Sequence, residues 1–364
     1  MGADGLTVAE LLSDPELERI FSIDEFETLA RERMDPAGFD YVAGGAWDEI
    51  TLRESVEAWR RRRFVPRVLT DVQSVTTAGS FLGRDAAIPV AMAPMAVQCL
   101  AHPEGEVEAV RGAARAGIPY IFSTAASRTL EETAQAAPDA ERWFQLYLVD
   151  SLDYARSLVE RATNTGYRAI ILTVDVPIVG YRPRDMRSGF IFPSQPHVDE
   201  ASRLRADRYG AINAQRELGL SWGLVDKIRS WTNLPVILKG ILSPLDARRA
   251  ADMDVGIIVS THGARQLDRV IAAADALPPI VDTVAGRVEV WVDGGIRSGL
   301  DILVAFALGA TGTLVGRPLY WSLATGGAAG IERAVMILRD EMATALTLLG
   351  VERPGLLDRG YLQA

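Results

Sequence analysis

Residues 288–297 read VEVWVDGGIR and residues 312–318 read GTLVGRP. In both stretches a short apolar run, typical of a buried strand, stops at a glycine-containing turn that also carries an arginine. Turns of this kind after the last two strands of a parallel β/α fold bind phosphate through backbone N–H groups. The two stretches therefore predict such strands and an anion site, with Arg297 and Arg317 as cations. Glycines that only permit tight turns are the alternative.

Six further apolar runs precede these two, and helical stretches separate them. The eight predicted strands are Ile88 to Ala93, Pro119 to Ser123, Trp143 to Leu148, Ala169 to Val174, Pro235 to Lys239, Gly256 to Ser260, Val288 to Val292 and Gly312 to Val315. Eight βα units predict an α/β fold, the closed (β/α)8 TIM barrel. An open doubly wound sheet is the alternative, but the turn at 93–97 has no Gly-x-Gly-x-x-Gly fingerprint.

The organisation along the chain predicts one domain over residues 1–364, since barrels of this class reach that length. Residues 1–84 form an N-terminal helical extension and lead-in, with apolar residues at helical spacing from Thr7 to Arg33. The gap between the fourth and fifth strands holds a polar insertion at 177–220, which we interpret as a mobile lid.

Composition excludes several classes of protein. A hydrophobic share of 48% with 24% charged residues suits a globular fold, and a net charge of −10 disfavours nucleic acid as a partner. The basic cluster Arg60 to Arg63 is interpreted as a solvated or intersubunit face. Cys99 is the single cysteine, so no intrachain disulfide or cysteine-rich metal site is expected. The N-terminus has no signal-peptide pattern, and we predict a cytoplasmic protein without a membrane partner.

Polar residues end nearly every predicted strand, and in a barrel these ends meet at one mouth. They are Ser123, Gln145, Tyr147, Thr173, Asp175, Lys239, His262, Arg265, Asp293, Gly294, Gly295, Arg297, Gly316 and Arg317. His262 is the candidate general base, with Asp175 as its orienting partner. Arg182 and Arg265 are candidates for gripping a substrate carboxylate.

Two further residues are open to more than one interpretation. Lys239 can stabilise an anion on a cofactor, form a Schiff base, or pair with Asp175 or Asp293. His102 precedes Glu104 and Glu106 at the start of a helix; we interpret it as structural, and no metal site is predicted.

Eight segments together identify the chain as similar to the FMN-dependent 2-hydroxy acid oxidases and dehydrogenases, the group of glycolate oxidase, lactate oxidase and mandelate dehydrogenase. They are DY at 40–41, GA at 45–46, AHPEGE at 101–106, FQLY at 144–147, LTVD at 172–175, LKG at 238–240, STHGARQLD at 260–268 and VDGG at 292–295. The resemblance runs from about Tyr41 to Leu349.

The resemblance implies FMN as cofactor and a role for each matching residue. His262 would be the base with Asp175 as partner, Arg182 and Arg265 would bind the carboxylate, and Tyr41 and Tyr147 would complete the catalytic pocket. The implied flavin contacts are Pro94, Met95, Ala96, Ser123, Gln145, Thr173, Lys239 and Ser260. The implied ribityl and phosphate contacts are Asp293, Gly294, Gly295, Arg297, Gly316 and Arg317.

Three residues depart from the pattern of that family. Ala125 replaces the tryptophan that glycolate oxidase carries over the substrate side chain, which predicts a larger substrate-binding pocket. Met95 replaces a small residue beside the flavin, and Thr261 replaces the asparagine that usually precedes the histidine; both affect the tuning of the redox chemistry.

The implied activity is oxidation of an (S)-2-hydroxy acid to the 2-oxo acid, on a large, aromatic, lactate/mandelate-like or carrier-attached substrate. Reduced flavin would pass its electrons to O2 and form H2O2, or, as the alternative, to a quinone or protein acceptor. A homotetramer is also implied. An isopentenyl diphosphate isomerase type of FMN barrel does not need the pair of His262 and Asp175, and a non-enzymatic flavin scaffold would have lost its polar mouth residues.

Overall fold

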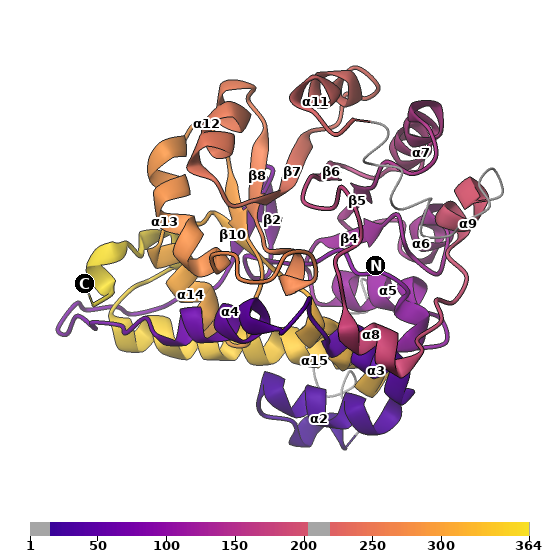
Figure 1. The fold of residues 1–364 in the computed structure, drawn as a ribbon. Coiled ribbons are helices and arrows are strands. Elements are labelled where there is room, and N and C mark those ends of the chain that lie inside the picture. Colours follow the sequence, from indigo (N-terminus) through magenta and orange to yellow (C-terminus); the bar gives the residue numbers. More distant parts are fainter. Residues whose placement is uncertain (1–14, 203–218, 364) are drawn as a thin grey trace, which may run out of the picture.

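Eight parallel strands pair into a barrel that closes between the last strand and the first (Figure 1). In the computed structural model, which describes residues 15–202 and 219–363, they are β3 (Val90–Met92), β4 (Tyr120–Ser123), β5 (Arg142–Leu146), β6 (Ile170–Thr173), β7 (Val236–Ile241), β8 (Gly256–Val259), β9 (Val290–Val292) and β10 (Gly312–Val315). Each predicted strand lies at its predicted place. The TIM barrel is therefore confirmed and the open sheet is excluded.

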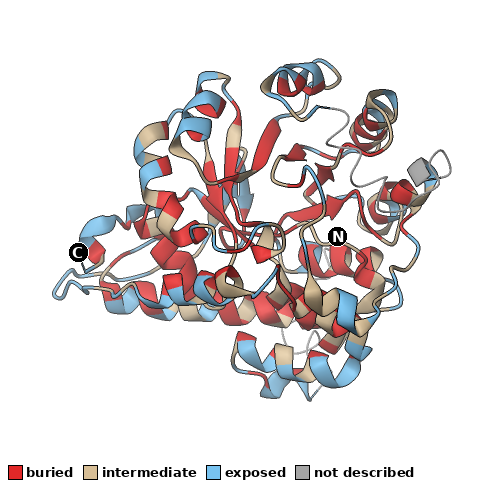
Figure 2. Cartoon of the chain, in the orientation of Figure 1, coloured by how far each residue is buried: buried red, intermediate tan, exposed pale blue. Residues whose placement is uncertain are grey.

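Helices surround the barrel and cover its outer face (Figure 1). They are α5 (Glu106–Arg115), α6 (Leu130–Ala136), α7 (Leu152–Asn164), α11 (Trp222–Arg229), α12 (Pro244–Asp252), α13 (Ala273–Val284), α14 (Gly299–Ala307) and α15 (Arg317–Leu349). Capping fixes several of their starts: Thr129 and Ser298, for example, form capping boxes with Glu132 and Asp301. The strands and the inward helix faces are buried, which gives the core seen in Figure 2.

Side chains on each strand alternate between the helix-facing side and the barrel interior. Apolar residues fill the lower part of the interior, and a polar residue follows two positions later on the same face. These pairs are Ile121 and Ser123, Trp143 and Gln145, Ile171 and Thr173, Ile237 and Lys239, Ile258 and Ser260, and Trp291 and Asp293. The strand period alone thus brings six polar side chains from six strands to one mouth.

A short hairpin, which the sequence analysis missed, closes the opposite end of the barrel. It joins β1 (Gly79–Phe81) to β2 (Arg84–Ala86) through Leu82 and Gly83, both with positive φ, as a type I′ turn requires. Phe81 lies edge-on to Trp143 and Trp291, with ring centroids 5.5 and 5.2 Å away. Because this hairpin closes one end of the barrel interior, the polar mouth is the open end.

Within the part that the structure describes, the N-terminal extension ends in the hairpin strand β1 and, as predicted, contains helices. They are η1 (Leu17–Arg19), α2 (Ile23–Arg33), α3 (Pro36–Ala43) and α4 (Ile50–Arg60); the predicted start near Thr7 lies outside the described residues. Helix α2 packs against α15, and α4 contacts α13 and α14. The end of α3 brings Tyr41 to the barrel mouth, because the backbone carbonyls of Tyr41 and Gly44 accept hydrogen bonds from Arg265.

The insertion after β6 contains two short helices, α8 (Pro183–Ser188) and α9 (Pro196–Ser202), and residues 203–218 of the predicted lid lie outside the described residues. The start of α9 is attached to the barrel helices. The His197 carbonyl accepts a hydrogen bond from the Tyr154 hydroxyl of α7, and His197 Nε2 accepts one from the Leu130 amide of α6. The first residues of α9 are therefore fixed in place, and that the insertion moves as a lid stays a prediction.

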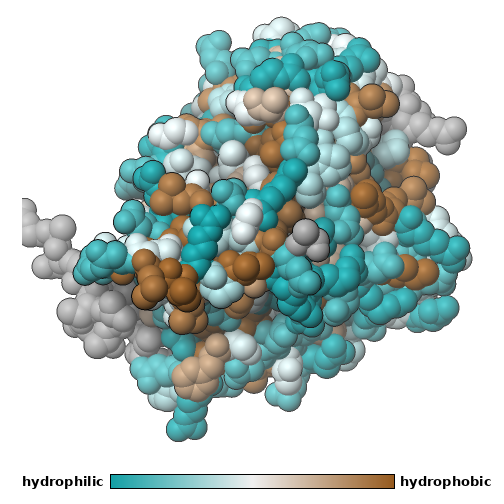
Figure 3. Space-filling view, turned by 90° about the vertical axis from the view of Figure 1, so that its left-hand side faces the viewer, coloured by the Kyte–Doolittle hydropathy of each residue, from teal (hydrophilic) through white to brown (hydrophobic). Residues whose placement is uncertain are grey.

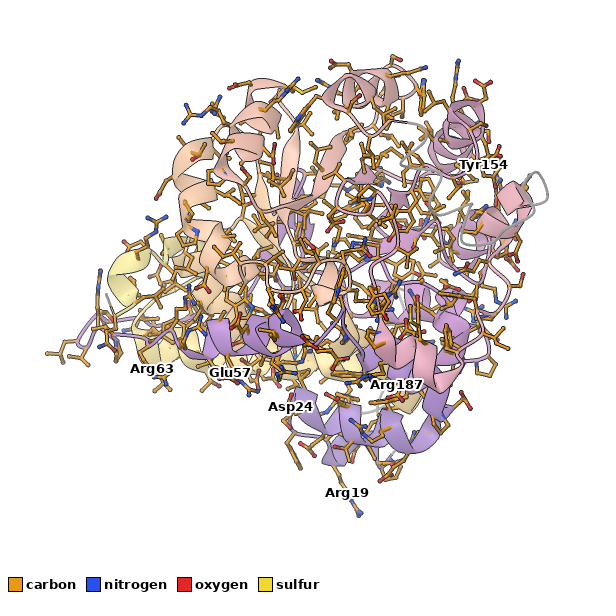
Figure 4. The ribbon with its side chains drawn as sticks, viewed as in Figure 1. Arg19, Asp24, Glu57, Arg63, Tyr154 and Arg187 are labelled. Carbon is orange, nitrogen blue, oxygen red and sulfur yellow. The ribbon has the colours of Figure 1, made fainter. Side chains whose placement is uncertain are left out.

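Three arginines of the basic cluster form ion pairs with acidic residues of the protein. Arg60 pairs with Asp24 and Glu57, two residues labelled in Figure 4, while Arg61 and Arg62 share Asp275. The face drawn in Figure 3 is mainly hydrophilic with small, separate hydrophobic patches, a common surface composition. Within the described residues no helix is long and apolar enough to cross a membrane, and no three His, Cys, Asp or Glu side chains gather into a metal site.

The buried His197 makes stability depend on pH. Burial lowers its pKa from 6.5 to about 4, so between these values the unfolded chain binds a proton that the folded chain excludes. The contribution of neutral His197 is complete above pH 6.5 and is lost as the pH falls toward 4, by on the order of 3 kcal/mol. His197→Asn does not titrate. We expect its stability deficit in urea unfolding to shrink by that amount between pH 7 and pH 4; an equal deficit at both pH values contradicts the assignment.

Candidate active site

His262 lies directly beyond β8 and faces the cavity at the mouth, which has a volume of about 200 Å³. Its Nδ1 lies 2.9 Å from Asp175 Oδ1 and its Nε2 lies 3.2 Å from the Tyr147 hydroxyl. The carboxylate can only accept, so Nδ1 carries the proton and Nε2 is left as the basic nitrogen. Asp175 lies behind the imidazole ring, as the orienting partner of a general base does.

Gly240 makes room for this pair. Its φ is +112°, and a Cβ atom there would lie 2.4 Å from the carboxyl carbon of Asp175. Any other residue would displace Asp175 from His262. The pKa of Tyr147 is raised by burial and by the negative charge of Asp175, so its phenol stays protonated and donates to Nε2.

Two guanidinium groups lie beside the Tyr41 ring on the same side of the cavity. The Cζ atoms of Arg265 and Arg182 lie 4.5 and 5.8 Å from the ring centroid. Arg265 Nη1 donates to main-chain carbonyls, but its buried Nη2 has no partner among the described residues. Arg182 lies 3.4 Å from Asp185, whose pKa burial raises. A partly buried cation with a free donor fits an incoming carboxylate.

The strand ends form a chain of hydrogen bonds across the mouth. Gln145 accepts from Ser123 Oγ at 3.0 Å and donates to Thr173 Oγ1 at 2.9 Å. Lys239 Nζ donates to Ser260 Oγ at 2.8 Å and lies 2.9 Å from Asp293 Oδ2. Among the alternatives for Lys239, the carboxylate partner is therefore Asp293 and not Asp175.

Two partly buried arginines lie without a carboxylate at salt-bridge distance among the described residues. Arg317 donates to the carbonyls of Val42 and Gly44, and burial, followed by the charge of Arg265, lowers its pKa to about 9. Arg297 donates only to the Ile296 carbonyl and lies over the Trp321 ring. Such charges are costly unless an anion joins them, so this end of the cavity suits a phosphate.

Gly295 lies where its turn meets helix α4. Its φ is +82°, and a Cβ there would lie 2.0 Å from the Ser55 carbonyl oxygen of α4. The glycine thus permits close packing of the turn against α4. That Gly295 also contacts a phosphate stays a prediction, and the arginines beside it fit an anion.

Most predicted site residues line this one cavity. They are Tyr41, Pro94, Met95, Ala96, Ser123, Ala125, Tyr147, Thr173, Arg182, Lys239, His262, Arg265, Asp293, Gly294, Gly295, Arg297, Gly316 and Arg317. Three predicted site residues do not line the cavity but form hydrogen bonds to residues that do: Asp175, Gln145 and Ser260. His102 lies outside the cavity, and its Nδ1 accepts from the Glu104 amide.

Several lining residues were missed by the sequence analysis. They are Val42, Val176, Val179, Phe192, Gln195, Gln266 and Tyr320. Phe192 and Gln195 lie in the polar insertion, where no periodicity signals which side chain turns inward. Gln266 was quoted only as part of a motif; it binds the carbonyls of Asp175 and Ile178 and accepts from the Gly180 amide, which fastens the loop after β6.

Comparison with known proteins gives a family and close structural relatives. Residues 30–364 match the FMN-dependent dehydrogenase family. L-lactate oxidase of Nostoc sp. is 40% identical over 93% of this chain and 96% of its own, and 4-hydroxymandelate oxidase of Amycolatopsis orientalis is 43% identical over 92% and 96%. The crystal structure of mandelate oxidase with (S)-4-hydroxymandelic acid superposes with a TM-score of 0.87, at 41% identity, over 94% of this chain and 98% of that one.

The polar mouth, the partly buried arginines and these matches along nearly the whole chain agree with one another. The chain belongs to the FMN-dependent dehydrogenase family, and it is an FMN-dependent oxidoreductase of the 2-hydroxy acid oxidase group.

Proposed function

We propose that the protein oxidises an (S)-2-hydroxy acid with a large or aromatic side chain to the 2-oxo acid, and that O2 reoxidises the reduced flavin and forms H2O2. The observation that carries the proposal is the position of His262 Nε2, which faces the cavity while Asp175 holds Nδ1 at 2.9 Å. Arg265, with a free donor, lies at the same cavity. A base and a carboxylate site in one cavity are what a 2-hydroxy acid needs.

In this proposal the protein binds, orients and deprotonates the substrate. Arg182 and Arg265 bind the substrate carboxylate. Tyr41 and Tyr147 form walls of the pocket around the reacting carbon. His262 Nε2 takes a proton from the substrate Cα or hydroxyl, and Asp175 stabilises the imidazolium that forms. Bound FMN supplies the acceptor for the two electrons that leave the substrate.

The residues present fit FMN. Arg297 and Arg317 would hold its phosphate, since both are partly buried and neither has a carboxylate at salt-bridge distance among the described residues. Ser123, Gln145, Thr173 and Lys239 would hydrogen-bond the polar edge of the ring, with Pro94, Met95 and Ala96 against it. Asp293 Oδ1, a buried acceptor with no partner among the described residues, would accept from the ribityl chain.

The size of the substrate follows from Ala125. This residue is buried, lines the cavity and packs against Val198, Ala96 and Tyr147. The absence of a bulky side chain there supports an aryl or long-chain acid. Two of the similar proteins are named for mandelate-type acids, which supports the same choice. The cytoplasmic location, the homotetramer, the carrier-attached substrate and the domain limits remain predictions from the sequence.

His262→Ala tests the base. We expect the holoenzyme to keep its yellow colour and to lose anaerobic bleaching by (S)-mandelate by about 10²–10⁴-fold, the usual effect of removing a general base. Asp175→Asn should cause a smaller loss, because the imidazole remains. His102→Gln, at a histidine outside the cavity, is the matched control and should bleach like the wild type. Normal bleaching in His262→Ala refutes the base.

Arg317→Met tests the phosphate site. Losing one charged hydrogen-bond donor should weaken FMN binding by about 10- to 100-fold, equivalent to about 1.5–3 kcal/mol. The measurement is fluorescence titration of the apoprotein with FMN, beside riboflavin, whose weaker binding should change little. Arg19→Met, at an exposed arginine of η1 that points away from the barrel (Figure 4), is the control. Equal losses for FMN and riboflavin would mean a general structural defect.

Ala125→Trp tests the size of the substrate pocket. The indole should fill the space above the reacting carbon and lower kcat/KM for (S)-mandelate by at least about 10-fold, while glycolate turnover is kept or rises. An oxygen electrode measures both substrates, and formation of H2O2 at the same rate identifies O2 as acceptor. Turnover only with a quinone supports the dehydrogenase alternative. An unchanged ratio between the two acids would show that Ala125 does not set the size limit.

A further inference from the structure

Gln195 is a buried polar residue at the cavity that the chemistry above does not use. It is 1% exposed, lines the cavity together with Ala125, and comes directly before α9 in the insertion. A carboxamide in such a place needs hydrogen-bond partners for both its oxygen and its nitrogen, because a buried polar group without one costs free energy.

The protein supplies a partner for one end of this carboxamide only. Gln195 Nε2 donates to the Ala125 carbonyl at 3.2 Å, and since a carbonyl can only accept, this contact settles which end is nitrogen. Gln195 Oε1 has no hydrogen-bond partner among the described residues. An acceptor with no protein partner is thus held beside the cavity.

Two hydrogen bonds to Asp199 hold the backbone of Gln195. Its amide donates to Asp199 Oδ2 at 2.9 Å, and its carbonyl accepts from the Asp199 amide at 2.7 Å. The next turn is held by His197, whose carbonyl accepts from Tyr154 at 2.8 Å; Tyr154 lies on α7 beside α9 (Figure 4). A side chain held this way is organised before any ligand arrives, which is what specific recognition requires.

The surroundings of Gln195 decide what its oxygen can meet. Ala125, Val176, Val179 and Phe192 line the same cavity and give it apolar walls, against which an aromatic ring is favourable. Ala125 has two effects, since its small side chain leaves space and its carbonyl orients the carboxamide. A ring that enters this space brings its edge to an acceptor without a partner.

We propose that Gln195 is a specificity-determining residue whose Oε1 accepts a hydrogen bond from a hydroxyl group on the substrate side chain, so that the substrate class is a 2-hydroxy acid with a hydroxylated ring. The inference rests on the proposed oxidation of acids with a large side chain. A ring without a donor leaves the carboxamide oxygen desolvated and unpaired, and this difference sets the preference.

The test uses the FMN-loaded enzyme and ligands that cannot react because they lack the 2-hydroxyl group. Phenylacetate, 3- and 4-hydroxyphenylacetate and 4-methoxyphenylacetate are titrated, and Kd is read from the change in the flavin spectrum. The wild type should bind one hydroxyphenylacetate about 10-fold more tightly than phenylacetate. The methoxy compound, which only accepts, should bind no better than phenylacetate. kcat/KM for mandelate and its ring-hydroxylated forms should follow the same order.

Gln195→Leu has a similar volume and no acceptor. It should bind all four ligands about equally and keep its affinity for phenylacetate. Gln135→Leu, the same change at an exposed glutamine of α6, should keep the wild-type preference. The wild-type comparison decides the inference even where Gln195→Leu fails to fold.

Other outcomes separate the two proposals. Bleaching by mandelate without any preference for ring hydroxyls, or a preference that survives in Gln195→Leu, overturns the role of Gln195 and leaves the proposed function intact. A preference for the methoxy compound also overturns it, because the carboxamide would then be donating. Bleaching by lactate with no binding of any arylacetate overturns both the large substrate and the role of Gln195.

Discussion

Closure of the barrel by the pairing of β10 with β3 is the constraint on which the site depends. Leu314 lies opposite Ala91 in the register, and this places the turn after β10 beside the turn after β3. Because all eight strands are parallel, their carboxyl ends share one rim, and residues as distant in sequence as Met95 and Arg317 line one cavity. Without closure the same strand ends would spread along an open edge.

The charged residues at this rim form two groups: some are paired with an opposite charge of the protein, and others are not. Lys239 with Asp293, and His262 with Asp175, are paired within the protein, so their positions are stable without a ligand. Arg265, Arg297 and Arg317 are partly buried and bond mainly to main-chain carbonyls, which neutralise no charge. Those cations favour anionic ligands, so the pairing pattern separates the charges that the protein itself neutralises from those that an anion can neutralise.

The insertion after β6 contacts two other parts of the mouth, whose polar groups come mainly from the strand ends. Phe190 and Phe192 pack on the ring of Tyr41, with centroids 4.3 and 5.1 Å away, and Gln195 reaches Ala125. The insertion thereby contacts the N-terminal extension and the loop after β4 at once. Changes in this segment can alter the shape of the side-chain pocket while His262 and Asp175 keep their geometry.

The amino-acid sequence by itself determined the strands, their order and most of the polar mouth. Strand periodicity is a local property: once Ile237 faces the barrel interior, Lys239 faces it too, and the same holds for Trp291 and Asp293. The motif around His262 is equally local. These features were readable because each depends on neighbours along the chain.

Only the tertiary structure decided which groups meet across the chain. Lys239 had two acidic candidates, and in the folded barrel its Nζ lies 2.9 Å from Asp293 Oδ2. The packing of the β1–β2 hairpin depends on contacts of Phe81 with two tryptophans from other strands. The orientation of the Gln195 side chain depends on a carbonyl 70 residues away in the sequence. Such contacts follow from the closure of the barrel and not from any local pattern, so no sequence periodicity predicts them.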